Sequence, residues 1–458
     1  MKLILFVSFF AALCHVLAVT KYPGNGPTPG DFEYPPDGYE NTEPGTILRS
    51  RKIDPAFFGI ADISGKAWQV LYRTSAQNDS MPMATLTTIL VPDHFRNDRL
   101  LLHQAIEDSA SFVCRPSLGL MERKLPAFEN ILQRLEMLLI STYMAQGWVV
   151  SVSDYEGPMS AFAVGPLSGY ATLDAARATL NFEDTGLDRS KTKIQGVGYS
   201  GGAIASSWAA QLQKSYAPEL NIVGWAFGGT PANLTYLVEK ADGTAVAGLI
   251  ALGATGVLNG YPELHGAAEK YLTDTAWRAV NQVRNSCEVG SIVPFAFQTI
   301  QSEKYIHGGL HLADVPGVNE VIANLTLARG KAAPIAPVYM FHALTDPEVP
   351  YPPAIDAARR WCANGAQVEF TTAVLGLEHI STYIGMFSRM FDWLEKRFEG
   401  KPLKSRKCQF KYITNAALNP VDDIKFAGHA LEVVKTLLGE MTGMEKYTKE
   451  QLQKKERN

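Results

Sequence analysis

The residues with the clearest chemical potential are Gly198-Tyr199-Ser200-Gly201-Gly202. They match the pattern G-x-S-x-G, in which a serine sits on a strained turn between a strand and a helix and exposes its hydroxyl. The apolar residues 194–197 precede the motif and the alanine-rich residues 203–212 follow it, as the pattern requires. The motif therefore predicts that Ser200 is a nucleophile, and the alternative is an ordinary glycine-rich turn.

A serine hydroxyl needs a base to become a nucleophile, and the base needs an acid that orients it. When a serine of this motif is used, the acid follows it along the chain and the histidine comes last. Asp346 follows a predicted strand at residues 337–341, and His379 follows another at residues 368–374. We therefore predict that Asp346 orients His379 and that His379 activates Ser200.

Other titratable residues compete for these roles. Glu348 lies two residues after Asp346 and is the alternative acid. His342 precedes every candidate acid and is interpreted as a packing residue at the end of a strand. His429 lies downstream in a predicted helix and is the alternative base. Glu378, next to the predicted base, is interpreted as a surface group or as a neighbour that supports the site.

The elements that must position these residues include both strands and helices. Residues 85–91 alternate with β-branched side chains and residues 148–152 form a compact apolar run, so both are predicted strands. Residues 171–182 and 380–398 place apolar side chains along one face and are predicted helices. These elements, on both sides of the serine motif, predict an α/β fold.

The composition is that of a large globular protein. The chain has 458 residues, of which 46% are hydrophobic and 19% are charged, below the average of roughly 25%. This composition supplies a large core and carries no signature of disorder. The 42 Lys and Arg nearly balance the 46 Asp and Glu without a basic run, which argues against nucleic acid as a partner. The length allows two or three domains, or one large α/β domain with insertions.

The N-terminus has the features of a secretory signal peptide. Lys2 is followed by the apolar residues 3–13 and by the small-residue sequence Val16-Leu17-Ala18. We predict cleavage after Ala18 and an extracellular protein. The alternative, an uncleaved membrane anchor, is disfavoured because the apolar run is shorter than the roughly 20 residues that span a bilayer.

The cysteines fit an oxidising compartment. Cys14 leaves with the signal peptide, and the even set that remains predicts two disulfides in one of three connectivities. A zinc site is disfavoured because no two cysteines have the close spacing of zinc ligands. The four remaining cysteines are Cys114, Cys287, Cys362 and Cys408.

Three N-x-Ser/Thr sequons agree with the same secretory route. Each sequon alone is a weak signal, and together they predict glycosylation in a eukaryotic host. The candidate sites are Asn78, Asn233 and Asn324.

Residues 230–334 fit neither a strand–helix alternation nor a repeat. They contain an apolar stretch at 245–254 that is too short to span a bilayer. Two interpretations are open: a buried helix of an accessory subdomain, or a lid that binds an acyl chain or contacts an interface. An acyl chain is apolar, so a lid that binds one would have to provide a dry apolar groove. Residues 445–458, rich in Lys and Glu, are predicted to form a solvated helical tail.

Five short motifs occur in a specific order along the chain. They are Asp108-Ser109 shortly before Cys114, Asp154-Tyr155-Glu156-Gly157-Pro158 after an apolar strand, Ser200 in its glycine motif, Asp346 before Val349-Pro350, and His379. In combination, and over nearly all of the predicted mature chain, they resemble the fungal secretory lipases of the yeast lipase A type. The resemblance implies an α/β-hydrolase with a mostly parallel central sheet flanked by helices and a large helical lid inserted between the nucleophile and the acid.

The resemblance also implies several details. It implies an oxyanion hole made by the backbone N–H of Gly201 and a donor from the loop of Asp108, and two such donors would stabilise the charge that forms on the ester oxygen. It implies the disulfides Cys114–Cys287 and Cys362–Cys408. The residues and the resemblance together predict a signal peptide at 1–18, an N-terminal arm at 19–46, a core in two parts at 47–229 and 335–458, the second with the C-terminal tail, and a lid at 230–334.

These inferences predict a secreted serine ester hydrolase that needs no metal and no cofactor. Acylglycerol is the leading substrate class, with a lipid–water interface as the place of action. The alternatives are a carboxylesterase that deacetylates a small secondary metabolite such as a trichothecene, a peptidase, and an inactive binding protein on the same fold. We expect no nucleic acid and no obligate protein partner.

Overall fold

The computed structural model of the chain describes residues 26–57, 61–62, 65–121, 131–374, 378–403, 405 and 407–414. The predicted signal peptide, His429 and the predicted tail at residues 445–458 lie outside the described residues. Within the described part of the chain, no helix has the length and apolar character needed to cross a bilayer.

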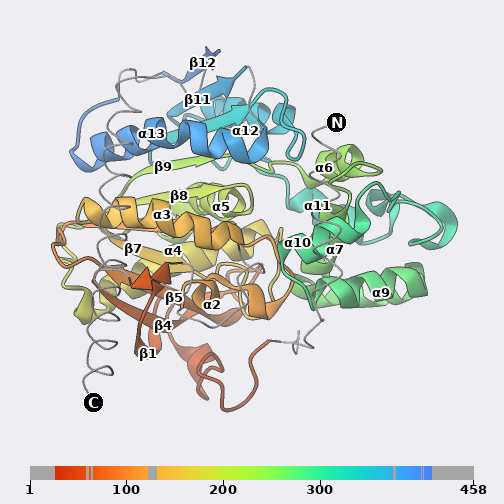
Figure 1. Cartoon of the computed structure of the whole chain (residues 1–458), viewed down its shortest axis with the longest axis horizontal. Helices are drawn as coiled ribbons and strands as arrows, with labels where there is room; N and C mark the ends of the chain where they lie inside the picture. The colour runs from red at the N-terminus through yellow and green to blue at the C-terminus, as the bar shows by residue number, and fades with distance from the viewer. Residues whose placement is uncertain are drawn as a thin grey trace, which may run out of the picture.

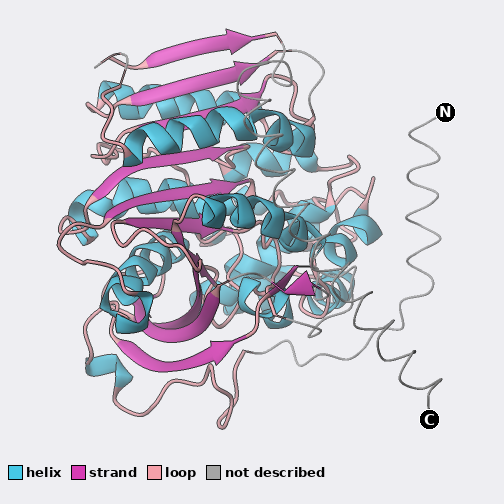
Figure 2. Ribbon diagram, turned by 60° about the vertical axis from the view of Figure 1, so that its left-hand side comes forward, coloured by secondary structure: helices cyan, strands magenta, loops and turns pink. Residues whose placement is uncertain are grey.

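A ten-stranded sheet forms the centre of the described structure (Figures 1 and 2). The strand order is β1-β4-β5-β7-β6-β8-β9-β10-β11-β12, and the pairs from β7 to β12 are all parallel, whereas β1, β4, β5 and β7 pair antiparallel. The predicted α/β fold class with a mostly parallel sheet is therefore confirmed. The strands are β1 (Ile47–Ile53), β4 (Lys66–Ser75), β5 (Pro82–Val91), β6 (Arg99–Gln104), β7 (Val149–Ser153), β8 (Lys193–Tyr199), β9 (Ile222–Gly228), β10 (Val338–Ala343), β11 (Val368–Ala373) and β12 (Gln409–Ile413); β2 (Ala56–Phe57) and β3 (Ala61–Asp62) pair separately.

Helices cover both faces of the sheet, as Figure 2 shows. Alternate side chains of a strand point to opposite faces, so Leu100 and Leu102 of β6 pack in the core with α4, α5 and α12, whereas Leu101 packs in the core with α3 and α13. Strands covered on both faces need apolar side chains on both, which explains the apolar runs in the sequence. The helices of this part of the chain are the short α2 (Pro116–Gly119) and the longer α3 (Ile131–Ala145), α4 (Gly165–Asn181), α5 (Gly201–Tyr216), α12 (Tyr351–Ala363) and α13 (His379–Phe398).

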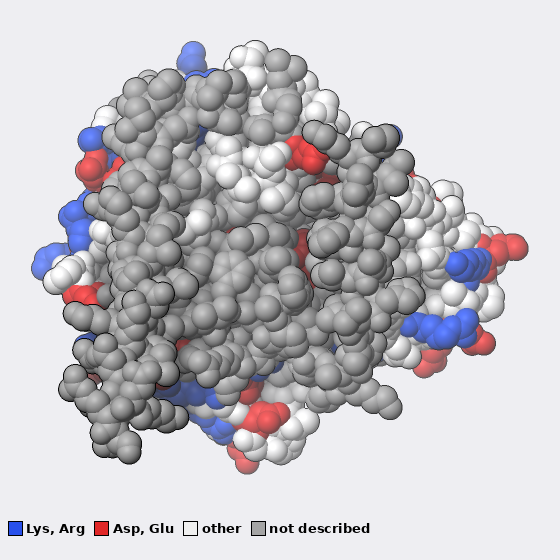
Figure 3. All heavy atoms as spheres, viewed as in Figure 1, with Lys and Arg blue, Asp and Glu red and all other residues white. Residues whose placement is uncertain are grey.

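Residues 230–334, here called the inserted segment, lie between β9 and β10 along the chain and are helical. They form the green part at the right of Figure 1, beside the sheet, and contribute no strand to it. Figure 3 shows acidic and basic side chains next to each other at this edge of the molecule, so the edge carries charges of both signs. The helices are α6 (Leu234–Ala241), α7 (Gly248–Gly260), α8 (His265–Tyr271), α9 (Asp274–Val283), α10 (Glu288–Ile292) and α11 (Val318–Asn324).

Helix α7 packs directly on a loop of the core. A Cβ atom on Gly256 would lie 2.4 Å from the carbonyl oxygen of Phe162, so only glycine permits this approach. The side-chain amide of Asn259 donates to the carbonyl oxygens of Ala110 and Ser160 at 3.4 and 3.2 Å. These contacts fix α7 to the core loops.

Two disulfides join distant parts of the described chain. Cys114–Cys287, with a sequence separation of 173, ties the loop after β6 to the inserted segment. Cys362–Cys408, with a separation of 46 residues, ties the end of α12 to the stretch before β12. These are the two pairings that the resemblance implies, and they occupy the four sulfurs that a zinc site would have needed.

Candidate active site

Ser200 occupies a sharp turn between β8 and α5. Its φ of +53° and ψ of −119° are strained for a residue with a side chain. The flanking glycines make the turn possible. A Cβ atom on Gly198 would lie 2.2 Å from the carbonyl oxygen of Gly202, and one on Gly202 would lie 2.1 Å from that of Gln104. The glycines of the motif are therefore required by the close approach of the backbone at this turn.

Three side chains form a hydrogen-bonded line at this turn. The Nε2 atom of His379 lies 2.8 Å from the hydroxyl oxygen of Ser200, and the Nδ1 atom lies 2.7 Å from Oδ2 of Asp346. The second carboxylate oxygen of Asp346 accepts the backbone N–H groups of Glu348 at 3.0 Å and Val349 at 2.9 Å. The structure thus brings together the predicted nucleophile, base and acid, and the alternative acid contributes its backbone to holding Asp346.

The electrostatics of this line keep Asp346 ionised. Burial lowers the pKa of His379, but the hydrogen bond and negative charge of Asp346 outweigh burial, so the pKa lies above its usual value. Burial raises the pKa of Asp346, but the bond from His379 outweighs burial, so that pKa lies below its usual value. An ionised Asp346 can stabilise the imidazolium that forms when His379 takes a proton.

Two residues next to this line, His342 and Glu378, lie in different surroundings. His342, at the end of β10, donates from Nε2 to the carbonyl oxygen of Val349 at 2.9 Å and lies 3.4 Å from Oδ2 of Asp346. It therefore borders the acid, and burial lowers its pKa. Glu378 is exposed and caps helix α13 reciprocally with Ser381. It fixes the start of the helix whose first residue is His379.

Asp108 and Gly201 lie side by side next to the serine. A Cβ atom on Gly201 would lie 1.8 Å from Oδ1 of Asp108, and both residues border the same pocket as Ser200. Asp108 has a φ of +36° and is buried. Burial raises the pKa of Asp108 to about 7, His379 opposes this effect, and the charges of Glu348 and Glu136 add to it.

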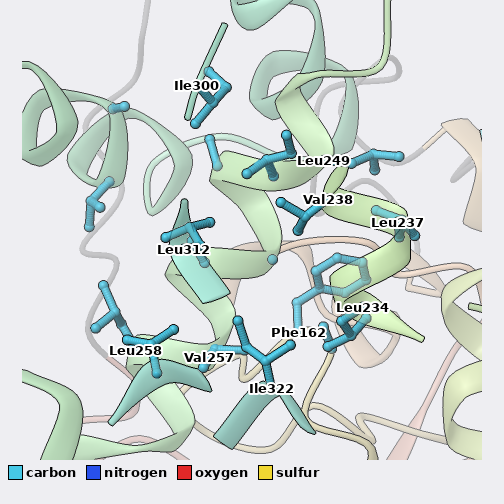
Figure 4. Close-up of a pocket in the computed structure, with 18 of the residues that line it drawn as sticks. Phe162, Leu234, Leu237, Val238, Leu249, Val257, Leu258, Ile300, Leu312 and Ile322 are labelled. Carbon is cyan, nitrogen blue, oxygen red and sulfur yellow. The ribbon is translucent and has the colours of Figure 1, made fainter. Parts of the chain in front are cut away.

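An apolar pocket opens at Ser200. Most of its wall comes from the inserted segment, and α7 contributes Leu249, Gly253 and Val257. Other residues of α7 are buried away from this pocket, with Leu252 and Thr255 in the protein interior. The apolar stretch at 245–254 thus both packs in the core and lines a pocket. The side chains that Figure 4 labels around this space are Phe162, Leu234, Leu237, Val238, Leu249, Val257, Leu258, Ile300, Leu312 and Ile322.

The pocket also contains one carboxyl group that sequence reasoning did not identify. Glu288, the first residue of α10, lines it together with Glu348. Burial raises the pKa of Glu288 well above its usual value, and the charge of Asp108 adds to this effect. A sequence signal existed, because Glu288 directly follows Cys287, whose implied partner Cys114 lies just after the Asp108 loop.

The other sequence predictions concern the three glycosylation sites and metal binding. Asn78 and Asn324 are exposed, whereas Asn233 is half-buried and accepts the backbone N–H of Tyr236 at 3.1 Å as the N-cap of α6. Among the described residues, no group of three or more His, Cys, Asp and Glu side chains is arranged to hold a metal ion.

Comparison with known proteins identifies the family. The family model described as secretory lipase matches residues 121–406. A secreted triacylglycerol lipase of Malassezia restricta is 38% identical over 94% of this chain and 92% of its own length, and one of Malassezia furfur is 38% identical over 92% and 84%. The closed state of Candida antarctica lipase A superimposes with a TM-score of 0.79 and 26% identity over 90% of this chain and 96% of that chain. The rice cell wall degrading esterase LipA of Xanthomonas oryzae, at 17% identity, shares the fold with a TM-score of 0.61 over 79% of this chain and 100% of that chain. The family model and these relatives together show that the chain belongs to the secretory lipase family.

Proposed function

We propose that this protein is an extracellular lipase that hydrolyses acylglycerol esters, with Ser200 as nucleophile, His379 as base and Asp346 as the acid that orients it. One observation carries the proposal: the Ser200 hydroxyl, 2.8 Å from Nε2 of His379, faces an apolar pocket. The relatives named as secreted triacylglycerol lipases support the same substrate class.

Acylation begins at the serine. The Ser200 oxygen attacks the ester carbonyl carbon while Nε2 of His379 takes the hydroxyl proton, and Asp346 stabilises the resulting imidazolium. The carbonyl oxygen becomes negative and is held by the backbone N–H groups of Gly201 and Asp108. The bond to the alcohol oxygen then breaks, and the alcohol leaves with the proton from His379.

Deacylation repeats these steps with water. His379 takes a proton from water as the water oxygen attacks the acyl carbon, and a second tetrahedral oxyanion forms in the same hole. Its collapse breaks the bond to Ser200, returns the proton to the serine and frees the fatty acid. Acylation and deacylation therefore use the same three side chains and the same two backbone N–H donors.

The pocket favours a long acyl chain over an acetyl group. Each methylene buried in an apolar wall contributes about 0.8 kcal/mol, so a long chain gains far more from this pocket than a short one. We assign the inserted segment as the lid over this acyl site and as the part that meets a lipid–water interface. The signal peptide ending at Ala18 and the sequons are part of the same proposal for secretion.

The test is a panel of nitrophenyl esters from acetate to palmitate, together with an emulsified triglyceride, measured on the wild type and on Ser200→Ala. We expect turnover of the triglyceride, a preference for long esters, and a loss of several orders of magnitude in kcat for the variant. A wild type that hydrolyses only acetate esters would indicate a metabolite esterase. A wild type without turnover would indicate a binding protein, and a folded, active Ser200→Ala would exclude Ser200 as the nucleophile.

A further inference from the structure

A buried carboxyl group outside the Ser200–His379–Asp346 line connects two of the elements that serve it. Glu136 lies on α3 and is 2% exposed. Its Oε2 atom accepts the backbone N–H of Ile106 at 2.7 Å. Its Oε1 atom accepts the hydroxyl of Tyr383 at 3.2 Å and lies 3.3 Å from Nε2 of His103. Burial of such a group is unfavourable unless hydrogen bonds compensate it, and here the bonds reach both sides of the site.

The bond to Ile106 holds the loop of the oxyanion hole. Ile106 lies two residues before Asp108, whose backbone has a φ of +36°. The preceding residue of this loop is held as well, because the hydroxyl of Tyr155 donates to the carbonyl oxygen of Ala105 at 2.8 Å. An oxyanion donor must lie within hydrogen-bond distance of the developing charge, so the position of this loop affects the rate directly.

The bond to Tyr383 holds the helix of the base. Tyr383 lies four residues after His379 on α13, so the two side chains share one face of the helix. The Tyr383 ring stacks on the ring of Tyr199 with 4.5 Å between centroids. Tyr199 immediately precedes Ser200. The hydroxyl that Glu136 accepts thus belongs to a side chain that packs against the strand end carrying the nucleophile.

We infer that Glu136 is a positioning residue for ester hydrolysis. It holds the oxyanion-hole loop and helix α13 in one fixed relation, so that the Asp108 N–H and His379 face the same adduct of Ser200. The inference rests on the proposed function. Glu136 acts through Ile106 and Tyr383.

Three variants separate this role from a purely structural one. Glu136→Met has a similar volume but accepts no hydrogen bond. Glu136→Gln keeps both contacts, because its amide oxygen can accept from Ile106 and its amide N–H can donate to the Tyr383 oxygen. Tyr383→Phe removes only the contact to α13. The control is Asp174→Asn, because Asp174 is a buried carboxyl on α4 that accepts bonds from Thr74, Tyr216 and Arg177, away from the serine.

The measurements are kcat and KM for nitrophenyl butyrate, the inhibition constant of an alkylboronic acid that forms a tetrahedral adduct with the serine, and Tm. For Glu136→Met we expect kcat to fall about 10- to 100-fold and boronate binding to weaken in parallel, with KM unchanged, because small displacements of catalytic groups have effects of this size. Glu136→Gln should restore kcat to within about threefold of the wild type, and Tyr383→Phe should lower kcat about fivefold. The control should lower Tm and leave kcat unchanged.

The inference is overturned if folded Glu136→Met keeps the kcat and the boronate affinity of the wild type. If Glu136→Met does not fold, Tyr383→Phe decides, and an unchanged kcat and boronate affinity overturn the inference. Neither of these results would contradict the proposed function, because that function is tested by turnover in the wild type and its loss in Ser200→Ala.

Discussion

The hydroxyl of Tyr199 donates to the backbone carbonyl oxygen of His379 at 2.6 Å, across 180 residues of sequence. The residue before the proposed nucleophile therefore holds the main chain of the proposed base. We expect Tyr199→Phe to lower kcat about fivefold with little change in KM, because one buried hydrogen bond contributes about 1 kcal/mol and its loss frees the His379 backbone. Steady-state kinetics with nitrophenyl butyrate test this. An unchanged kcat with a lower Tm would mean that the bond serves only the fold.

The two carboxyl groups of the acid loop should differ sharply. Asp346→Asn should lower kcat about 10⁴-fold, because an amide at this position favours the wrong tautomer of His379. Glu348→Gln should stay within a few-fold of the wild type, because the contact of Glu348 with Asp346 comes from its backbone N–H. Each variant is the control for the other in the same ester assay. The reverse order of effects would assign the acid to Glu348.

The pH profile should depend on Asp108. His379 must be neutral to take a proton, so kcat/KM rises as the pH rises through its pKa. Burial lowers that pKa, Asp346 raises it most, and Asp108 adds to the increase. Asp108→Asn should therefore move the acid limb to lower pH. Above about pH 7, where Asp108 ionises beside the oxyanion, the variant should also retain more of its activity than the wild type. A kcat/KM profile of the variant that superimposes on that of the wild type would contradict this.

The part of the site that lies on strand ends is predictable from sequence. The serine motif, the order Ser200, Asp346, His379 and the apolar runs before them correspond to β8, β10 and β11 in the structure, and the predicted helix after the motif is α5. These elements are buried on both faces or have one apolar face, so their side-chain patterns are strong.

The supporting residues have no such pattern. Glu136 contacts Ile106 and Tyr383, which are 30 and 247 residues away, so nothing near it in the sequence marks its role. Strand β6 was also not predicted, because its sequence, Arg99–Gln104, combines three leucines with residues that are common in helices. Helix α4 starts at Gly165, six residues before the predicted start at residue 171, with a proline in its first turn.

Position 253 should control the acyl chain length. Gly253 of α7 borders the pocket, and a Cβ atom there would meet nothing within 4 Å. Gly253→Leu should therefore fill the pocket and lower turnover of palmitate relative to acetate esters about tenfold, the size expected from overpacking by 1–3 kcal/mol. Gly266→Leu on α8 is the matched control, because this glycine also has open space but does not border the pocket. Equal losses on both esters would contradict an acyl role for this wall.

The buried carboxyl groups should make the fold most stable in acid. Burial raises the pKa of Glu107 and Glu156 well above the usual value, and that of Asp154 to about 6. A pKa raised in the folded state contributes stability below the unfolded pKa, near 4, and this contribution is lost as the pH rises through the folded value. Tm should therefore fall between about pH 5 and pH 8, and Glu156→Gln should flatten the decline. Thermal unfolding across this range tests it, and a rising Tm would contradict it.

The disulfide Cys114–Cys287 has a consequence for the newly made chain. Its two cysteines enclose Ser200, whereas His379 follows the serine only after 179 further residues. Translation can therefore deliver the nucleophile, the inserted segment and the bond between them before Asp346 and His379 exist. Until the last third of the polypeptide is made, the serine has neither its proposed base nor its proposed acid. On the proposed mechanism, the growing chain is therefore expected to lack ester hydrolysis until the last strands of the parallel sheet and the start of α13 have been made.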